Sequence, residues 1–187
     1  MMRIDRIWCM PNHLTFQIAP IAQLFNEEVH DGLWIDPFAR DSKVASITND
    51  INPETTADHH MDALEFLRTF DDKSVDGVLF DPPYSLRQVK ECYDEIGRSL
   101  TDHESKHFFE DLKDEISRIT KSKGRVISFG WNSGGVGKTR GFTLERVLLV
   151  PHGGIHNDTI VTVEVKSLTI KPKPKPAKQH NMGDYFE

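Results

Sequence analysis

Four consecutive residues, Asp81-Pro82-Pro83-Tyr84, combine groups that could activate a planar amine. The exocyclic amine of a nucleobase is a poor nucleophile because its lone pair is delocalised into the ring. A site that accepts the amine hydrogens, through the Asp81 carboxylate and the Pro82 carbonyl, would restore nucleophilic character to the nitrogen. The ring of Tyr84 could stack on the base and fix the direction of attack. This chemistry points to the transfer of a methyl group to an exocyclic amine.

A buried strand is predicted directly before this turn. Residues 75–80 form a short run rich in β-branched and aromatic side chains, bounded by polar residues. The two prolines end the strand because neither can donate a backbone N–H. Ligands of open α/β sheets bind at the carboxyl ends of the strands. The turn is therefore expected at the ligand-binding edge of a sheet.

Three more carboxylates occur at comparable places upstream. Residues 32–35 form a predicted strand that leads into Asp36, and residues 44–48 form a second strand followed by Asp50. Asp62 directly precedes a predicted helix. A carboxylate after the second strand can accept both hydroxyls of a nucleoside ribose, so Asp50 is a candidate ribose ligand.

The order and spacing of these motifs resemble the amino-methyltransferases of nucleic acids, and in particular the small adenine-specific DNA methyltransferases of viruses and stand-alone microbial genes. The likeness extends from Phe16 to about Val165. It implies a Rossmann-like α/β fold with a mostly parallel seven-stranded sheet, helices on both faces and a terminal antiparallel strand pair. It also implies S-adenosylmethionine as the methyl donor and N6 of a flipped adenine in double-stranded DNA as the acceptor. The chain departs from the family at Ala39 and Arg40, where glycine is expected.

The resemblance also assigns roles to individual residues, with Asp62 expected to accept from the adenine amino group of the cofactor. The catalytic turn comprises Asp81, Pro82, Pro83 and Tyr84. Cofactor contacts are expected at Phe16, Asp36, Pro37, Phe38, Asp50, Ile51, Asp62, Ala63 and Asp81. DNA contacts are expected at Arg87, Gln88, Lys90, Trp131, Lys138 and Arg140. The loop from His152 to Asp158, between two predicted antiparallel strands, either adds to the base pocket or is a plain hairpin loop.

Two further patterns resemble other kinds of site. Residues 103–107 match the zinc-protease pattern His-Glu-x-x-His, but they lie in a helix predicted through Ile119 and no third ligand can be named, so no metal is expected. Residues 132–139 resemble a phosphate loop. There, Asn132 replaces the leading glycine, and a strand is predicted to follow in place of the helix that would hold phosphates.

Length and composition fit a single catalytic domain. A chain of 187 residues can bury one core but cannot also hold a large target-recognition domain. Two cysteines, together with no long apolar run and no secretion signal, predict a cytoplasmic protein in a reducing compartment. The net charge of -6 requires any DNA-binding positive charge to be local.

The composition changes abruptly near the end of the chain. Residues 1–167 are predicted to form the catalytic domain, residues 168–178 a Lys/Pro-rich extended linker, and residues 179–187 a binding motif. This last segment is similar to the motif that binds PCNA-type sliding clamps, through Gln179, Met182, Tyr185 and Phe186. Such clamps belong to archaea and eukaryotes, so an archaeal cell or its virus is the expected home.

Three other functions remain open at this stage. The first is methylation of guanine N2 in structured RNA, by enzymes that carry similar turns. The second is methylation of cytosine N4, although those enzymes more often carry Ser in place of Asp81. The third is an inactive methyltransferase fold that serves as a clamp-binding adaptor, which the non-glycine Ala39 and Arg40 would fit.

Overall fold

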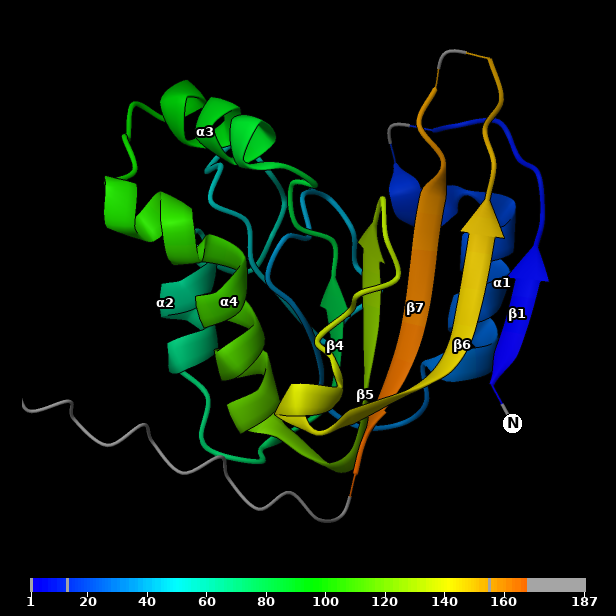
Figure 1. The fold of residues 1–187 in the computed structure, drawn as a ribbon. Helices are drawn as coiled ribbons and strands as arrows, with labels where there is room; N and C mark the ends of the chain where they lie inside the picture. The colour runs from blue at the N-terminus through cyan, green and yellow to red at the C-terminus, as the bar shows by residue number, and fades with distance from the viewer. Residues whose placement is uncertain (1, 13, 155, 168–187) are drawn as a thin grey trace, which may run out of the picture.

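The computed structural model describes residues 2–12, 14–154 and 156–167. These residues form one seven-stranded sheet in the order β1-β6-β7-β5-β4-β2-β3 (Figure 1). The strands are β1 (Arg3–Arg6), β2 (Trp34–Asp36), β3 (Ile47–Thr48), β4 (Val75–Phe80), β5 (Thr120–Gly130), β6 (Phe142–Val150) and β7 (Thr159–Lys166). Only β7 runs antiparallel to its neighbours β5 and β6, and the other pairs are parallel. The predicted fold class is therefore confirmed.

Helices cover both faces of this sheet, with α1 on one face and α2 and α4 on the other (Figure 1). The helices are η1 (Thr15–Gln17), α1 (Ala19–Glu28), α2 (Ala63–Arg68), α3 (Leu86–Glu95), α4 (Asp102–Ile119) and η2 (Lys138–Arg140), where η marks a 3-10 helix. Alternate side chains of the central strands enter the two cores. Leu79 packs on the α1 side, whereas Val78 and Phe80 pack on the α4 side.

Helix α4 shows how the local sequence fixes one of these layers. Thr101 and Glu104 form a capping box, in which each side chain bonds to the backbone N–H of the other residue. Leu112, Ile116 and Ile119 recur at helical spacing and are fully buried against the sheet. The predicted helix through residue 119 is thus confirmed, and it ends directly at the start of β5.

Two strands differ from the sequence-based expectation. Strand β1 was not predicted, because three of its four residues are charged and it lies at the edge of the sheet beside β6. Strand β3 is shorter than the predicted residues 44–48, since only Ile47 and Thr48 pair with β2. The side chain of Val44 is exposed and contributes no buried face.

No helix among the described residues is long and apolar enough to cross a membrane. The predicted linker and clamp-binding motif fall on residues 168–187, which lie outside the described residues.

Candidate active site

The predicted catalytic turn leaves the carboxyl end of β4 and leads into α3. Its backbone is held by Gln88, whose side-chain oxygen accepts a hydrogen bond from the N–H of Tyr84 at 2.7 Å. Ser85 caps α3 by accepting from the N–H of Gln88 at 3.3 Å. Gln88, predicted to contact DNA, therefore positions the catalytic turn from within the protein.

The carboxyl group of Asp81 is partly buried within this turn. Burial raises its pKa to about 6, although hydrogen bonds from Tyr84 and Thr15 and the charge of Arg40 act in the opposite direction. Asp81 is thus an ionised acceptor above about pH 6 and a protonated acid below it. Burial and the neighbouring Asp81 also raise the pKa of Tyr84, so its phenol keeps its proton.

Asp36, at the end of β2, is the most unusual side chain of the site. It is fully buried, and its Oδ1 accepts a hydrogen bond from the N–H of Phe38 at 2.9 Å. Its Oδ2 has no hydrogen-bond partner among the described residues. Burial raises the pKa of Asp36 well above its ordinary value, with further contributions from Asp81 and Asp50. A buried acceptor of this kind requires a donor or a cation, which a bound ligand could supply.

The loop after β2 keeps the backbone path expected of a glycine loop. Arg40 has a φ of 50°, in the left-handed region that favours glycine. Its N–H donates to Oδ2 of Asp50 at 2.9 Å, and the N–H of Asn52 donates to Oδ1 of Asp50 at 2.9 Å. The departure at Arg40 therefore preserves the backbone conformation and adds an exposed cation beside the site.

Asn49 is a structural residue of this region that sequence reasoning missed. It is fully buried, and its amide nitrogen donates to the carbonyls of Pro37 at 3.2 Å and Met61 at 3.0 Å. Its side-chain oxygen accepts from the N–H of Met61 at 3.0 Å. Asn49 thus ties together the loops that follow β2 and β3. The signal available in the sequence was a polar residue at the buried end of a predicted strand.

Asp62, predicted to accept from the adenine amino group of the cofactor, makes several hydrogen bonds within the protein. Its Oδ1 caps α2 by accepting from the N–H groups of Leu64 and Glu65. Its Oδ2 accepts from the hydroxyl of Tyr93 and pairs with Arg98 at 3.2 Å. Helix capping and this ion pair therefore engage both oxygens of its carboxylate. The next residue, Ala63, is buried in the core.

The remaining cofactor candidates line the same region. Phe38 packs near Phe80, with ring centroids 6.0 Å apart. Phe16 is partly buried on the α1 face, where its ring lies 5.1 Å from that of Phe129. Pro37 is buried and Ile51 is partly exposed. The structure therefore places Phe38 beside β4, and Phe16 next in sequence to Thr15, one of the groups that lower the pKa of Asp81.

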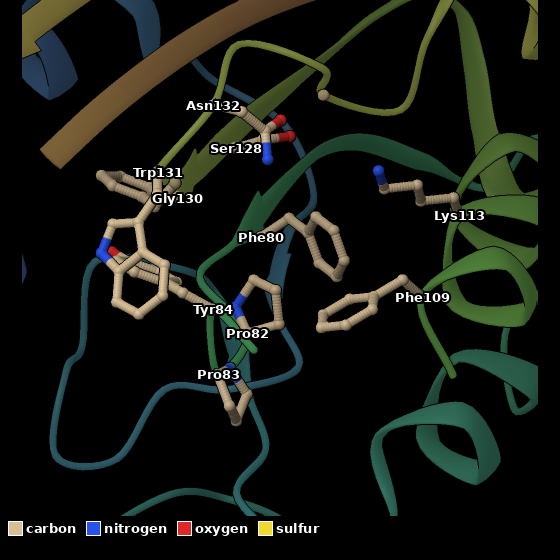
Figure 2. A pocket seen from close by; sticks show the side chains of 12 residues that line it. Phe80, Pro82, Pro83, Tyr84, Phe109, Lys113, Ser128, Gly130, Trp131 and Asn132 are labelled. Carbon is tan, nitrogen blue, oxygen red and sulfur yellow. The ribbon is translucent and has the colours of Figure 1, made fainter. Parts of the chain in front are cut away.

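A cleft of about 220 Å³ opens between the catalytic turn, the end of β5 and α4. Figure 2 shows the rings of Trp131 and Phe109 on opposite sides of Pro82. Tyr84 meets Trp131 edge to face, with ring centroids 5.7 Å apart. The cleft is lined by Phe80, Pro82, Pro83, Tyr84, Phe109, Lys113, Ser128, Phe129, Gly130, Trp131, Asn132 and Gly135. Phe109 and Lys113 of α4 and Ser128 of β5 were missed, because the sequence of a helix or strand does not show which of its residues border a cavity.

Two polar groups of this cleft have unusual surroundings. Ser128 is only 6% exposed, and its hydroxyl has no hydrogen-bond partner among the described residues. Lys113 is partly buried on α4, and burial lowers the pKa of its ammonium group. The cleft therefore combines aromatic walls with two donors, an arrangement suited to a flat heterocycle with acceptor atoms.

The glycine-rich loop after β5 is held by a carboxylate of the protein itself. Buried Glu164 accepts from the N–H groups of Val136 at 2.6 Å and Gly137 at 3.0 Å. Gly135 has a φ of 49°, and a Cβ at this position would clash with the carboxylate of Glu164. Backbone N–H groups that would bind phosphate in a phosphate loop thus bind Glu164. The rejection of a phosphate loop is consistent with this geometry.

The predicted DNA-contacting residues fall into two groups. Arg87 and Lys90 are exposed on α3 near the catalytic turn, and Trp131 is 43% exposed at the cleft. Lys138 and Arg140 instead lie directly before the start of β6. This end of the sheet is opposite to the carboxyl end of β4, where the predicted catalytic turn lies (Figure 1). Arg140 is also paired with Asp114 of α4. The structure therefore does not bring these last two residues to the site.

The loop between β6 and β7 is anchored by His152. The buried imidazole lies 2.8 Å from the carbonyl of Cys9 and 2.9 Å from the hydroxyl of Thr159. His152 thus ties the segment after β1 to the hairpin.

Among the described residues, no cluster of three or more His, Cys, Asp or Glu side chains could hold a metal ion.

Comparisons with known proteins address the fold of this chain. A scan against protein-family models and a search of curated proteins give no match. Among solved structures, the chain is similar to TrmN from Thermus thermophilus, with a TM-score of 0.53 and 17% identity, over 80% of this chain and 49% of that one. The chain thus spans about half the length of that protein.

A second similar structure is 1,6-didemethyltoxoflavin-N1-methyltransferase from Burkholderia thailandensis, which was crystallised with S-adenosylhomocysteine. The TM-score is 0.53 and the identity 12%, over 78% of this chain and 76% of that one. Together with the strand order and the antiparallel β7, this likeness shows that the chain has the Rossmann-like fold of S-adenosylmethionine-dependent methyltransferases.

Proposed function

We propose that the protein is an S-adenosylmethionine-dependent methyltransferase that modifies N6 of adenine in DNA. The observation that carries this proposal is the position of Asp81. Its carboxylate lies at the carboxyl end of β4, close enough to Asp36 to raise the pKa of that buried acid. The cleft bounded by Pro82 and Tyr84 opens beside it. One carboxylate is thus available to a cofactor and a second to a target amine.

The residues around Asp36 fit S-adenosylmethionine. The unpartnered Oδ2 of Asp36 would accept from the ammonium group of the cofactor, which would also offset the burial of the carboxylate. Asp50, already fixed by two backbone N–H groups, would accept from the ribose hydroxyls. When bound, the cofactor supplies an activated methyl group on a sulfonium. The left-handed backbone at Arg40 is the conformation that glycine would adopt in the expected loop.

The target base would enter the aromatic cleft from a flipped nucleotide. Tyr84 would stack on the ring, while Asp81 and the carbonyl of Pro82 accept hydrogen bonds from the N6 amine. N6 gains the methyl group and loses one proton, and the Asp81 carboxylate is the nearest group able to take that proton. The carboxylate at position 81 supports adenine over cytosine, because cytosine-specific enzymes more often carry serine there.

The proposal is tested by incubating the full chain with S-adenosylmethionine and unmethylated duplex DNA, followed by mass spectrometry of the nucleosides. Asp81→Ala is the control. We expect N6-methyladenine with the wild type and none with the variant. Methylated guanine in a parallel incubation with structured RNA, and no methylated base in DNA, would overturn the assignment to DNA.

We further propose that residues 179–187 tether the enzyme to a PCNA-type sliding clamp. The support is the sequence pattern alone, in which Met182, Tyr185 and Phe186 would fill an apolar pocket and Gln179 would make polar contacts beside it. Binding to an archaeal clamp should be measured by calorimetry with the full chain and with a Tyr185→Ala and Phe186→Ala double variant. Equal affinity of both proteins would refute the tether.

A further inference from the structure

The outer edge of β1 is a surface that the proposed function does not use. β1 is the terminal strand of the sheet, and no strand among the described residues pairs with its other edge. Five of the eight large apolar side chains that are exposed in the described residues lie on residues 2–10. Ile4 is 60% exposed and Trp8 is 58% exposed. An open strand edge flanked by apolar side chains is suited to pairing with another strand.

The backbone of this segment determines which residues could form such a pair. The N–H of Ile7 donates to the carbonyl of Leu149 at 3.0 Å, and the N–H of Cys9 donates to the carbonyl of Pro151 at 3.2 Å. Because successive residues of a strand turn their backbone groups to opposite sides, the odd-numbered residues face β6. The backbone groups of Met2, Ile4 and Arg6 therefore face the open edge.

Among two-fold axes that pass through a residue of β1, the charges leave one register for self-association. The β1 strands of two copies related by a two-fold axis pair antiparallel. The even-numbered residues of one copy can pair with even-numbered residues of the other only if the axis passes through a residue, and not between two residues. An axis at Arg3, Asp5 or Arg6 would place two identical charges face to face, which is unfavourable. An axis at Ile4 instead places Ile4 opposite itself and Arg3 opposite Asp5 of the second copy.

We propose that β1 pairs antiparallel with β1 of a second copy of this chain, with Ile4 on the two-fold axis. Arg3 already bonds to Asp5 of its own strand at 2.8 Å, and it would then lie between two aspartates. Asp5 is held in place by Arg146 at 3.1 Å. The exposed Ile4 side chains would cover each other, and the two sheets would become one continuous sheet.

A symmetric cysteine tests this register directly. Ile4→Cys, in a background where Cys9 and Cys92 are replaced by Ser, places two thiols across the axis at the spacing of a hydrogen-bonded pair, about 5.5 Å between Cα atoms. We expect a covalent dimer after mild oxidation, resolved on a non-reducing gel. The matched control is Arg6→Cys, which lies opposite Met2 and should give little cross-linking. Equal cross-linking of both variants, or none of Ile4→Cys, would overturn the proposal.

The full chain provides an independent measurement by analytical ultracentrifugation. The wild type should sediment with twice the mass of a single chain at micromolar concentration. Arg3→Glu places a carboxylate opposite Asp5 of the second copy and should weaken the dimer about tenfold, whereas Arg6→Glu should leave it within about twofold. A monomeric wild type, as expected if residues 168–187 of the same chain covered β1, would refute the proposal.

Discussion

The two halves of the carboxyl edge of the sheet are built in different ways. On the proposed cofactor side, after β2 and β3, the carboxylates of Asp36 and Asp50 are fixed by backbone N–H groups. On the proposed target side, beside the ends of β4 and β5, aromatic rings line the same cleft as the donors Lys113 of α4 and Ser128 of β5. The first region offers fixed acceptors for hydroxyl and ammonium groups, and the second offers flat surfaces and donors for a heterocycle. Asp81 lies on the boundary between them.

The largest effect is expected at this boundary. Asp81→Asn keeps the size of the side chain but weakens its capacity to accept the amine hydrogens. We expect methyl transfer to fall by about 100- to 1,000-fold, because one catalytic hydrogen-bonding group contributes on this scale. Single-turnover methylation measures the rate. Affinity for S-adenosylhomocysteine should change little, and a parallel loss of that affinity would argue that Asp81 supports the cofactor side instead.

Asp36→Asn should weaken cofactor binding selectively. Loss of the buried negative charge is expected to weaken S-adenosylmethionine binding about 10- to 100-fold, since a charged hydrogen bond is lost. DNA affinity should stay within about twofold. Calorimetry with the cofactor and fluorescence anisotropy with duplex DNA provide the two values, and exposed Asp31→Asn is the matched control. Weakened DNA binding with unchanged cofactor binding would reverse the assignment of the two regions.

Changes in the cleft should slow methyl transfer to DNA and leave cofactor binding unchanged. Lys113→Met and Ser128→Ala each remove one donor, and we expect the turnover rate on DNA to fall about tenfold with cofactor affinity unchanged. Lys106→Met, on the exposed face of the same helix, is the control. Lys113→Arg should restore part of the rate. If Lys106→Met and Lys113→Met had equal effects, the cleft would not be the target pocket.

The pKa of Asp81 predicts a specific pH dependence. Because the folded pKa of about 6 exceeds the ordinary value of 3.8, the folded state binds the proton more tightly than the unfolded state. This group therefore makes stability fall as pH rises from about 4 to 6, and activity should rise over the upper part of the same range. Asp81→Asn should stabilise the protein by about 1–2 kcal/mol at pH 8 but not at pH 3.5. Urea unfolding at both pH values measures this, and an equal gain at both would refute it.

The smallest effect concerns the distant basic residues. Lys138→Ala should leave DNA affinity unchanged, because Lys138 lies at the opposite edge of the sheet. Lys90→Ala, on α3 beside the catalytic turn, should weaken binding severalfold and reduce its salt dependence. Anisotropy titrations at two salt concentrations compare the variants. A larger loss at Lys138 would place the DNA on the other side of the molecule.

The sequence predicted the fold because the central strands carry strong local signals. Residues 75–80 form a strand with the predicted bounds, and the prolines after it end that strand as expected. Strand β1 could not be predicted, because a charged edge strand lacks an apolar pattern and is held in place by β6. The same limit applies to β3, where only two residues pair with β2.

Parts of the site depend on contacts between distant segments, which sequence patterns do not report. Asp62 follows the expected spacing, yet its oxygens are engaged by α2 and by Tyr93 and Arg98. Arg40 breaks the glycine pattern but keeps the glycine conformation. Ser128 and Lys113 line the same cleft although they lie on β5 and α4, which are distinct elements of the fold. Strand-end motifs therefore located the edge of the sheet, and packing determined which side chains are available there.

The most direct test compares wild type, Asp36→Asn and Asp81→Asn in two assays. The first is the Kd of S-adenosylhomocysteine by calorimetry, and the second is the yield of N6-methyladenine in duplex DNA at saturating S-adenosylmethionine. We predict that Asp81→Asn binds the cofactor product like the wild type and yields almost no methyladenine, whereas Asp36→Asn binds weakly and recovers product as the cofactor concentration rises. Full methylation by Asp81→Asn would contradict the proposed role of the catalytic turn.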